Sequence, residues 1–211
     1  MLEVRDLSAE RSERCLFDGL SLRLESGQLM QVAGPNGVGK TTLLGMVAGL
    51  SQPLSGEIFW NGISIAEDPQ AFRRSFSYLG HLSGMKAALS ASENLSFALA
   101  LRGLKVSVSA VFGALEQVGL RGYEHTPVNQ LSAGQKRRVA LARLRLEAAP
   151  LWILDEPFTA LDRKGVSELE HLLGEHAIQG GMVLFTTHHD LADRLPVKVL
   201  DVAAFRPRSV S

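Results

Sequence analysis

The 211-residue sequence contains a single cysteine, no excess charge of either sign and no long apolar run. Cys15 alone cannot form an internal disulfide or a cysteine-only metal site, and one free thiol fits a reducing compartment. Lys plus Arg and Asp plus Glu both number 22, so no global basic field attracts the chain to nucleic acid or to an anionic membrane. The best apolar run, residues 95–101, is far shorter than the roughly 18–20 residues of a membrane-spanning helix. Because residues 1–6 also lack the apolar core of a secretory signal, we expect a cytosolic chain that depends on another subunit for any membrane span.

The hydrophobic pattern predicts an α/β core that is interrupted by helices. Alternation over 20–24 and a compact apolar run over 29–33 predict short strands in the first ~80 residues, with one helix, from the loop at 34–41 to Gly49, among them. The period becomes helical from 90 to 147. Apolar runs at 151–154 and 182–185 are typical of buried parallel strands, with a crossover helix between them. We therefore predict one domain, with a core of residues 1–81 and 146–211 and a helical subdomain of residues 82–145.

A glycine-rich loop follows the predicted strand at 29–33. It has the spacing G-x-x-x-x-G-K-T between a strand and a helix, the context in which this motif binds phosphate. Glycine lets backbone N–H groups turn inward around the phosphates, Lys40 reaches the β and γ phosphates, and Thr41 offers a hydroxyl to Mg²⁺. The predicted nucleotide-binding residues are Gly34, Pro35, Asn36, Gly37, Val38, Gly39, Lys40, Thr41 and Thr42.

Two carboxylates follow the buried strand at 151–154. This strand delivers Asp155 to the sheet edge where the phosphate loop also lies. Mg²⁺ needs a carboxylate there, so Asp155 and Thr41 are the predicted metal ligands. Glu156 faces another way and is placed to polarise the attacking water. Together with Lys40, the acidic pair predicts phosphoryl transfer from a nucleotide.

A second glycine-containing loop, with the sequence Leu131, Ser132, Ala133, Gly134 and Gln135, begins another predicted helix. Ser132 and Gly134 are suited to donate a hydroxyl and a backbone N–H to an anion, yet no nucleotide pocket accompanies them. The helix continues with five basic side chains, which we interpret as a solvated face rather than a polyanion-binding patch. They are Lys136, Arg137, Arg138, Arg143 and Arg145.

Residues 131–135 resemble the signature motif of the ATP-binding cassette (ABC) ATPases, at the usual distance before Asp155. The resemblance covers essentially the whole chain. It implies a P-loop core with an antiparallel β subdomain, and a head-to-tail dimer in which each signature closes on the γ-phosphate held by the other copy. It also implies that Ala160, Leu161 and Asp162 form a loop at the dimer interface. The residues implied in catalysis are Lys40, Glu156 and His188. By residue type His189 is an equally good candidate, and only the position of His188 after the predicted strand at 182–185 favours it.

Several stretches are similar to one subgroup, the ATP-binding subunits of the cytochrome c maturation transporter. They include residues 78–81, 127–143 and 151–160. The similarity implies an ATP-driven translocase subunit with ATP and Mg²⁺ as cofactors, peripheral on the cytoplasmic face of the inner membrane. The implied partners are a second copy, a membrane permease and haem-handling proteins, without nucleic acid. The alternatives are the ATPase of another small-substrate transporter and, from a different class, a nucleotide-gated clamp on nucleic acid or ribosomes.

The sequence departs from the family pattern at two positions. Most ABC ATPases have Gln where His81 stands. Because Leu82 follows it, no glutamine is nearby, and we hypothesise that His81 takes over the role of the glutamine through a ring nitrogen or a bridging water. No aromatic residue lies between Ala9 and Cys15 to stack on adenine, so Arg11 or Arg14 is expected to stack on the base through its guanidinium plane.

Overall fold

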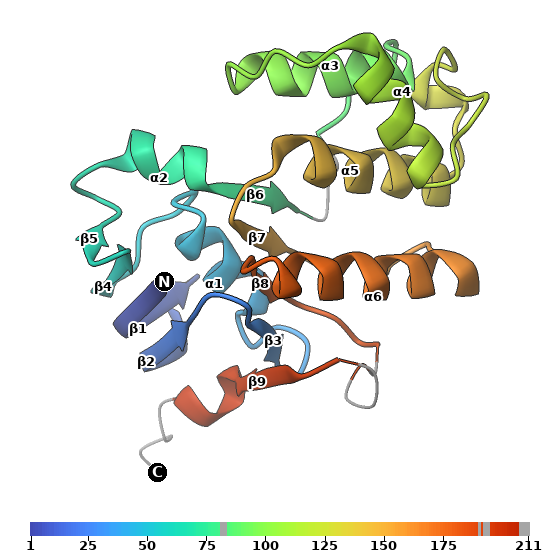
Figure 1. Ribbon diagram of the computed structural model, residues 1–211. Helices are drawn as coiled ribbons and strands as arrows, with labels where there is room; N and C mark the ends of the chain where they lie inside the picture. The colour runs from blue at the N-terminus through green and yellow to red at the C-terminus, as the bar shows by residue number, and fades with distance from the viewer. Residues whose placement is uncertain (81–83, 190, 192–194, 207–211) are drawn as a thin grey trace.

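The computed structural model describes residues 1–80, 84–189, 191 and 195–206 (Figure 1). An antiparallel sheet has the strand order β2-β1-β4-β5 and consists of β1 (Leu2–Arg11), β2 (Arg14–Leu24), β4 (Ser55–Trp60) and β5 (Ile63–Ser64). The turn between β1 and β2 has two residues, Ser12 and Glu13, with φ of 52° and 61°. Positive φ at both positions gives the tight hairpin turn that matches the twist of its strands. The hairpin therefore has a defined tip.

The second sheet is parallel throughout and has the order β6-β7-β8-β3-β9. Its strands are β3 (Leu29–Ala33), β6 (Phe76–Leu79), β7 (Leu151–Leu154), β8 (Met182–Phe185) and β9 (Val197–Asp201). Every residue of β7 and β8 is buried, as the continuous apolar runs predicted. Because the strands are parallel, the segments that follow β3, β7 and β8 all leave from the same edge of the sheet.

The parallel sheet separates two hydrophobic cores. Alternate residues of β7 point to opposite faces: Trp152 and Leu154 pack with the helical half of the molecule, whereas Leu151 and Ile153 pack with the antiparallel sheet. The helix α1 (Lys40–Val47) belongs to the second core, and α6 (Arg163–Ile178) belongs to the first. The sheet edge is therefore held rigidly from both sides.

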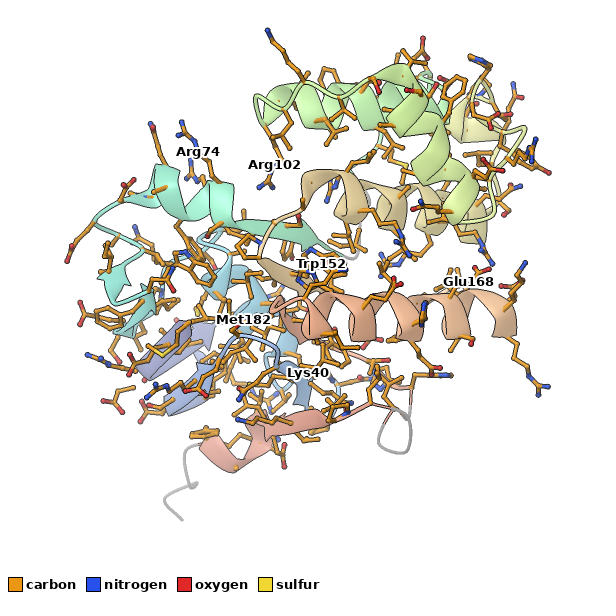
Figure 2. All side chains as sticks on the ribbon, in the orientation of Figure 1. Lys40, Arg74, Arg102, Trp152, Glu168 and Met182 are labelled. Atoms are coloured by element: carbon orange, nitrogen blue, oxygen red, sulfur yellow. The ribbon has the colours of Figure 1, made fainter. Side chains whose placement is uncertain are left out.

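Three helices, α3 (Ala91–Leu101), α4 (Val108–Gln117) and α5 (Ala133–Glu147), form the helical lobe above α6 (Figure 1). Each begins after a serine whose side chain accepts a backbone N–H, a strong helix-start signal. A 3-10 turn, Val128–Gln130, precedes α5. Arg102, at the end of α3, donates to the carbonyl of Arg73 at 3.2 Å and so joins the lobe to the core (Figure 2).

One helix of the first 80 residues was not predicted. The sequence pattern indicated a single helix among the strands, yet α2 (Pro69–Ser75) also forms there. Its only buried residue is Phe72, so it has no hydrophobic period, although Asp68 as N-cap and Pro69 in the first turn are start signals. A second 3-10 turn, Val202–Phe205, follows β9.

The predicted α/β fold class is confirmed, with a parallel core, an antiparallel sheet and a helical lobe. The subdomain boundaries at residues 81/82 and 145/146 stay a prediction. None of the helices in the described ranges combines the length and apolar character needed to cross a bilayer.

Candidate active site at the edge of the parallel sheet

A pocket at the carboxyl edge of the parallel sheet brings together the phosphate loop, the acidic pair and His188. The tip of the β1–β2 hairpin forms its far wall, with Arg11 and Arg14 on either side of the turn. The lining residues are Arg11, Ser12, Arg14, Leu16, Asn36, Gly37, Gly39, Lys40, Thr41, Thr42, Asp155, Glu156 and His188. Segments that are far apart in the sequence thus share one cavity. Gly34, Pro35 and Val38 belong to the loop but do not line the cavity.

The phosphate loop connects β3 to α1 through backbone that only glycine adopts easily. Gly34, Gly37 and Gly39 have φ of 133°, 76° and 110°. A Cβ on Gly39 would also lie 3.1 Å from the side chains of Leu16 and Phe17. Lys40 Nζ donates to the carbonyl of Gly34 at 2.7 Å, so the ammonium group folds back over the loop (Figure 2). No side chain caps α1, and Lys40, Thr41 and Thr42 of its first turn line the cavity, so the helix start is available to an anion there.

The acidic pair is fixed to the end of the neighbouring strand. Asp155 is buried, and its N–H donates to the carbonyl of Leu79 at 2.7 Å. Thr186, directly after β8, donates its hydroxyl to Asp155 Oδ1 at 2.6 Å and accepts the N–H of Glu156 at 2.8 Å. Glu156 has a left-handed φ of 48°. Both acids line the cavity, and the prediction that Glu156 faces another way than Asp155 stays a prediction.

His188 and His189 have different surroundings. Nε2 of His188 lies 3.5 Å from Oε1 of Glu156, and the His188 side chain is 66% exposed at the cavity. The ring of His189 instead stacks on Phe158, with centroids 5.5 Å apart. Of the two candidates, only His188 reaches the acidic pair.

The second glycine loop lies outside this pocket. Ser132 is the N-cap of α5: its Oγ accepts the N–H of Gln135 at 3.1 Å, and Gln135 Oε1 accepts the N–H of Ser132 at 2.9 Å. Leu131 is buried, and Ala133 begins α5. A Cβ on Gly134 would lie 2.8 Å from the carbonyl oxygen of Ala160. The signature loop therefore packs against the predicted interface loop of its own chain. None of the residues 131–135 is among the described residues that line the cavity.

The predicted interface loop is held at the start of α6. Ala160 has a φ of 65°, and Asp162 is the N-cap, accepting the N–H of Gly165 at 2.8 Å. Arg138 of α5 pairs with Asp162 at 2.8 Å and with Glu168 of α6 at 2.6 Å. The Gly165 N–H, and then Arg138, hold the pKa of Asp162 below its ordinary value. These contacts tie the helix that carries the signature to α6.

The interpretation of the basic residues of α5 as a solvated face is wrong for Arg137, which is only 8% exposed. Burial lowers the pKa of its guanidinium, against the attraction of Asp155 and Glu156. The reason is its phase: Leu141 and Leu144, four and seven positions later, share its helix face and are buried. That spacing was a signal in the sequence. His81, the predicted substitute for glutamine, lies outside the described residues.

Comparisons with known proteins agree with this geometry. Residues 17–159 match the family described as "ABC transporter". A Vibrio cholerae protein named "Cytochrome c biogenesis ATP-binding export protein CcmA" is 53% identical over 191 residues, which cover 90% of this chain and 92% of the relative. The solved structure of an ATP-binding subunit of an ABC transporter is 27% identical with a TM-score of 0.84, over 96% of this chain and 86% of that one. A dimeric ATP-binding cassette bound to ADP and Pi, at 24% identity and a TM-score of 0.84, covers 96% and 95% of the two chains and shows likeness of fold alone.

Proposed function

This chain belongs to the ABC transporter family of ATPases, and we propose that its ATP hydrolysis drives a membrane complex in c-type cytochrome biogenesis. The complex exports haem or releases haem from its chaperone. The observation that carries the assignment of the process is the 53% identity, over nine-tenths of the chain, to a protein named for cytochrome c biogenesis. The alternative is the ATPase subunit of another small-substrate ABC transporter.

The pocket supports a division of labour among its residues. The loop at 34–42 surrounds the phosphates, and Lys40 neutralises charge on the β and γ oxygens. Thr41 and Asp155 line the same cavity, and a hydroxyl with a carboxylate is the oxygen ligand set that Mg²⁺ accepts beside a nucleotide. A Mg²⁺ ion held by these two residues would supply positive charge to offset the charge that develops on the phosphates. Glu156 orients and polarises the attacking water, while His188 beside it holds the γ-phosphate end.

Arg11 and Arg14 flank the hairpin tip in the cavity wall, where an adenine base would extend from the phosphates. Either guanidinium plane can stack on the base in place of an aromatic side chain.

The signature loop completes the site from a second copy. Ser132 and Gly134 are separate from the cavity of their own chain, so they serve the nucleotide of a partner in a head-to-tail dimer. A relative of the same fold is dimeric with ADP and Pi, which supports this arrangement. The chain then acts at the cytoplasmic face of the inner membrane with a permease subunit, and haem-handling proteins are its further partners.

The catalytic assignment is tested by Glu156→Gln in the chain assembled with its membrane partner. Removing the carboxylate removes the general base, so turnover falls by about 100-fold or more while ATP remains bound and the dimer persists. Steady-state ATPase rates and size-exclusion chromatography with ATP measure the two effects. Glu175→Gln, on the outer part of α6, is the matched control and keeps the parent rate. Parent-like turnover in Glu156→Gln would show that another group is the base.

The assignment to cytochrome biogenesis needs a cellular readout. Cells whose chromosomal copy carries Glu156→Gln should lose covalently attached haem from their c-type cytochromes, as measured by haem staining. Copurification of a haem-handling membrane protein with the parent chain is the second expected result. Normal c-type cytochromes in these cells would favour the alternative transporter.

A further inference from the structure

Arg137 is a buried arginine, and among the described residues its guanidinium hydrogen-bonds only to backbone oxygens. It lies in the second turn of α5, two residues after the signature loop, and it points to the ends of β6 and β7. Nε donates to the carbonyl of Pro157 at 3.0 Å, and Nη2 donates to that of Asp155 at 2.9 Å and to that of Glu156. Nη1 donates to the carbonyl of Gly80 at 3.4 Å. One side chain thus binds three consecutive peptide groups around the acidic pair.

This use of a buried cation is unusual. Buried charges are generally paired, because an unpaired charge loses its hydration without compensation. Within the described residues no carboxylate lies at ion-pair distance from Arg137, whereas its neighbour Arg138 pairs with two. The hydrogen bonds of Arg137 go instead to the carbonyl groups of the turn that positions Glu156, so this side chain stabilises the conformation of that turn.

The peptide groups of Glu156 are held from two sides. Its N–H donates to Thr186 Oγ1 at 2.8 Å, which is a contact within the parallel core. Its carbonyl accepts from Arg137, which is a contact with the helical lobe. The φ of 48° between them is uncommon for a residue with a side chain and persists only when the surroundings impose it. The direction of the Glu156 carboxylate therefore depends on both contacts.

We propose that Arg137 is a positioning residue that holds Glu156 in its catalytic conformation and couples it to the helix that begins with the signature loop. The idea rests on the proposed role of Glu156 as the base. Because α5 carries both the signature and Arg137, a shift of this helix moves the support of the base with it. Closure of a partner's nucleotide on Ser132 then acts on the water-activating residue of the same chain through one rigid helix.

The test compares Arg137→Met with Arg137→Lys in the chain assembled with its membrane partner. Methionine fills similar space but donates no hydrogen bond, so kcat falls by about 100-fold as the base loses its direction. The affinity for a fluorescent ATP analogue stays within about threefold of the parent, because the phosphate loop is untouched. Lysine keeps a charge and a donor, so Arg137→Lys retains part of the kcat that Arg137→Met loses. If Arg137→Met does not fold, a kcat of Arg137→Lys below that of the parent, with unchanged nucleotide affinity, supports the proposal. Arg145→Met is the control: Arg145 lies on the same helix and pairs with Glu175, so this variant keeps the parent kcat.

A double variant separates positioning from general structural support. If Arg137 acts through Glu156, then Arg137→Met changes the residual single-turnover rate of Glu156→Gln by no more than about threefold. An equally large loss in both backgrounds overturns the proposal, as does a kcat that is unchanged in Arg137→Met or a matching loss of nucleotide affinity. If Glu156→Gln itself keeps the parent rate, it is the assignment of the base that fails, and this result is distinct from a failure of Arg137 alone.

Discussion

Two glycine-containing loops in this chain each begin a helix, but they satisfy the helix start in different ways. The loop before α1 ends at Gly39, with a φ of 110° and no side-chain cap. The loop before α5 ends at Ser132, whose side chain and that of Gln135 close a reciprocal pair of hydrogen bonds. The first helix start leaves its N–H groups for a ligand, whereas the second satisfies its own.

This difference implies that the two predicted anion sites differ in whether the helix start needs a bound anion for its stability. A helix start without a cap is stabilised by a bound phosphate, so we expect the loop at 34–42 to bind ATP in a single chain. A capped start is stable without a ligand, so we expect the signature loop to keep its shape before the nucleotide of a second copy reaches it. The following predictions test this contrast, from the largest expected effect to the smallest.

The largest effect is expected at the uncapped loop. Lys40→Met removes the ammonium group that folds over the loop, so ATP binding to the isolated chain weakens by about 100-fold, or roughly 2–3 kcal/mol for lost charged hydrogen bonds. Isothermal titration with ATP measures the affinity. Lys164→Met, an exposed lysine on α6, is the control and keeps the parent affinity. If Lys40→Met bound ATP as tightly as the parent chain, the uncapped loop would not be the ATP-binding site that distinguishes it from the signature loop.

A smaller effect is expected from filling the space beside the second loop. Gly134→Ala places a Cβ 2.8 Å from the carbonyl oxygen of Ala160, and such overpacking against backbone costs about 2 kcal/mol. Gly113→Ala, inside α4 with no atom within 4 Å of the new Cβ, should instead stabilise by about 0.5–1 kcal/mol. Urea unfolding curves of the two variants give both values. Equal stabilisation by both would show that Gly134 is not needed for this close approach.

The smallest effect is expected from opening the cap. Ser132→Ala costs about 1 kcal/mol of stability, as does Ser107→Ala at the start of α4. Only Ser132→Ala should also slow turnover of the assembled complex, by about tenfold, because a hydrogen bond to the partner's phosphate is lost. ATP binding to the isolated chain stays unchanged in both. A matching loss of turnover in Ser107→Ala would mean that helix stability, and not the signature hydroxyl, limits the rate.

The elements that the sequence predicted well are those whose causes are local. The strand at 29–33, the glycine loop and the helix start at Lys40 follow from turn geometry and composition. The buried runs over 151–154 and 182–185 are strands with the predicted bounds. In contrast, α2 was missed because its one buried residue, Phe72, is too little to give the repeating hydrophobic pattern from which a helix is predicted.

Arg137 was misassigned for a different reason. Arginine side chains are usually exposed to solvent, and only the spacing of Arg137 to Leu141 and Leu144 indicated that its side chain is buried in the core. The preference for His188 over His189 came from its position after the strand at 182–185. In the structure the ring of His188 lies beside Glu156, and that of His189 stacks on Phe158.

By itself, the sequence determined the phosphate loop and the two acids after a buried strand, because each is a short motif whose chemistry follows from adjacent residues, whereas the role of the signature came from its resemblance to a family. Tertiary structure alone decided that Thr186 binds both acids, that Gly134 packs against the carbonyl of Ala160 and that Arg137 supports the turn at Glu156. These are contacts between segments far apart in the chain. They arise only when both faces of one parallel sheet are packed and its strand ends are brought to a common edge.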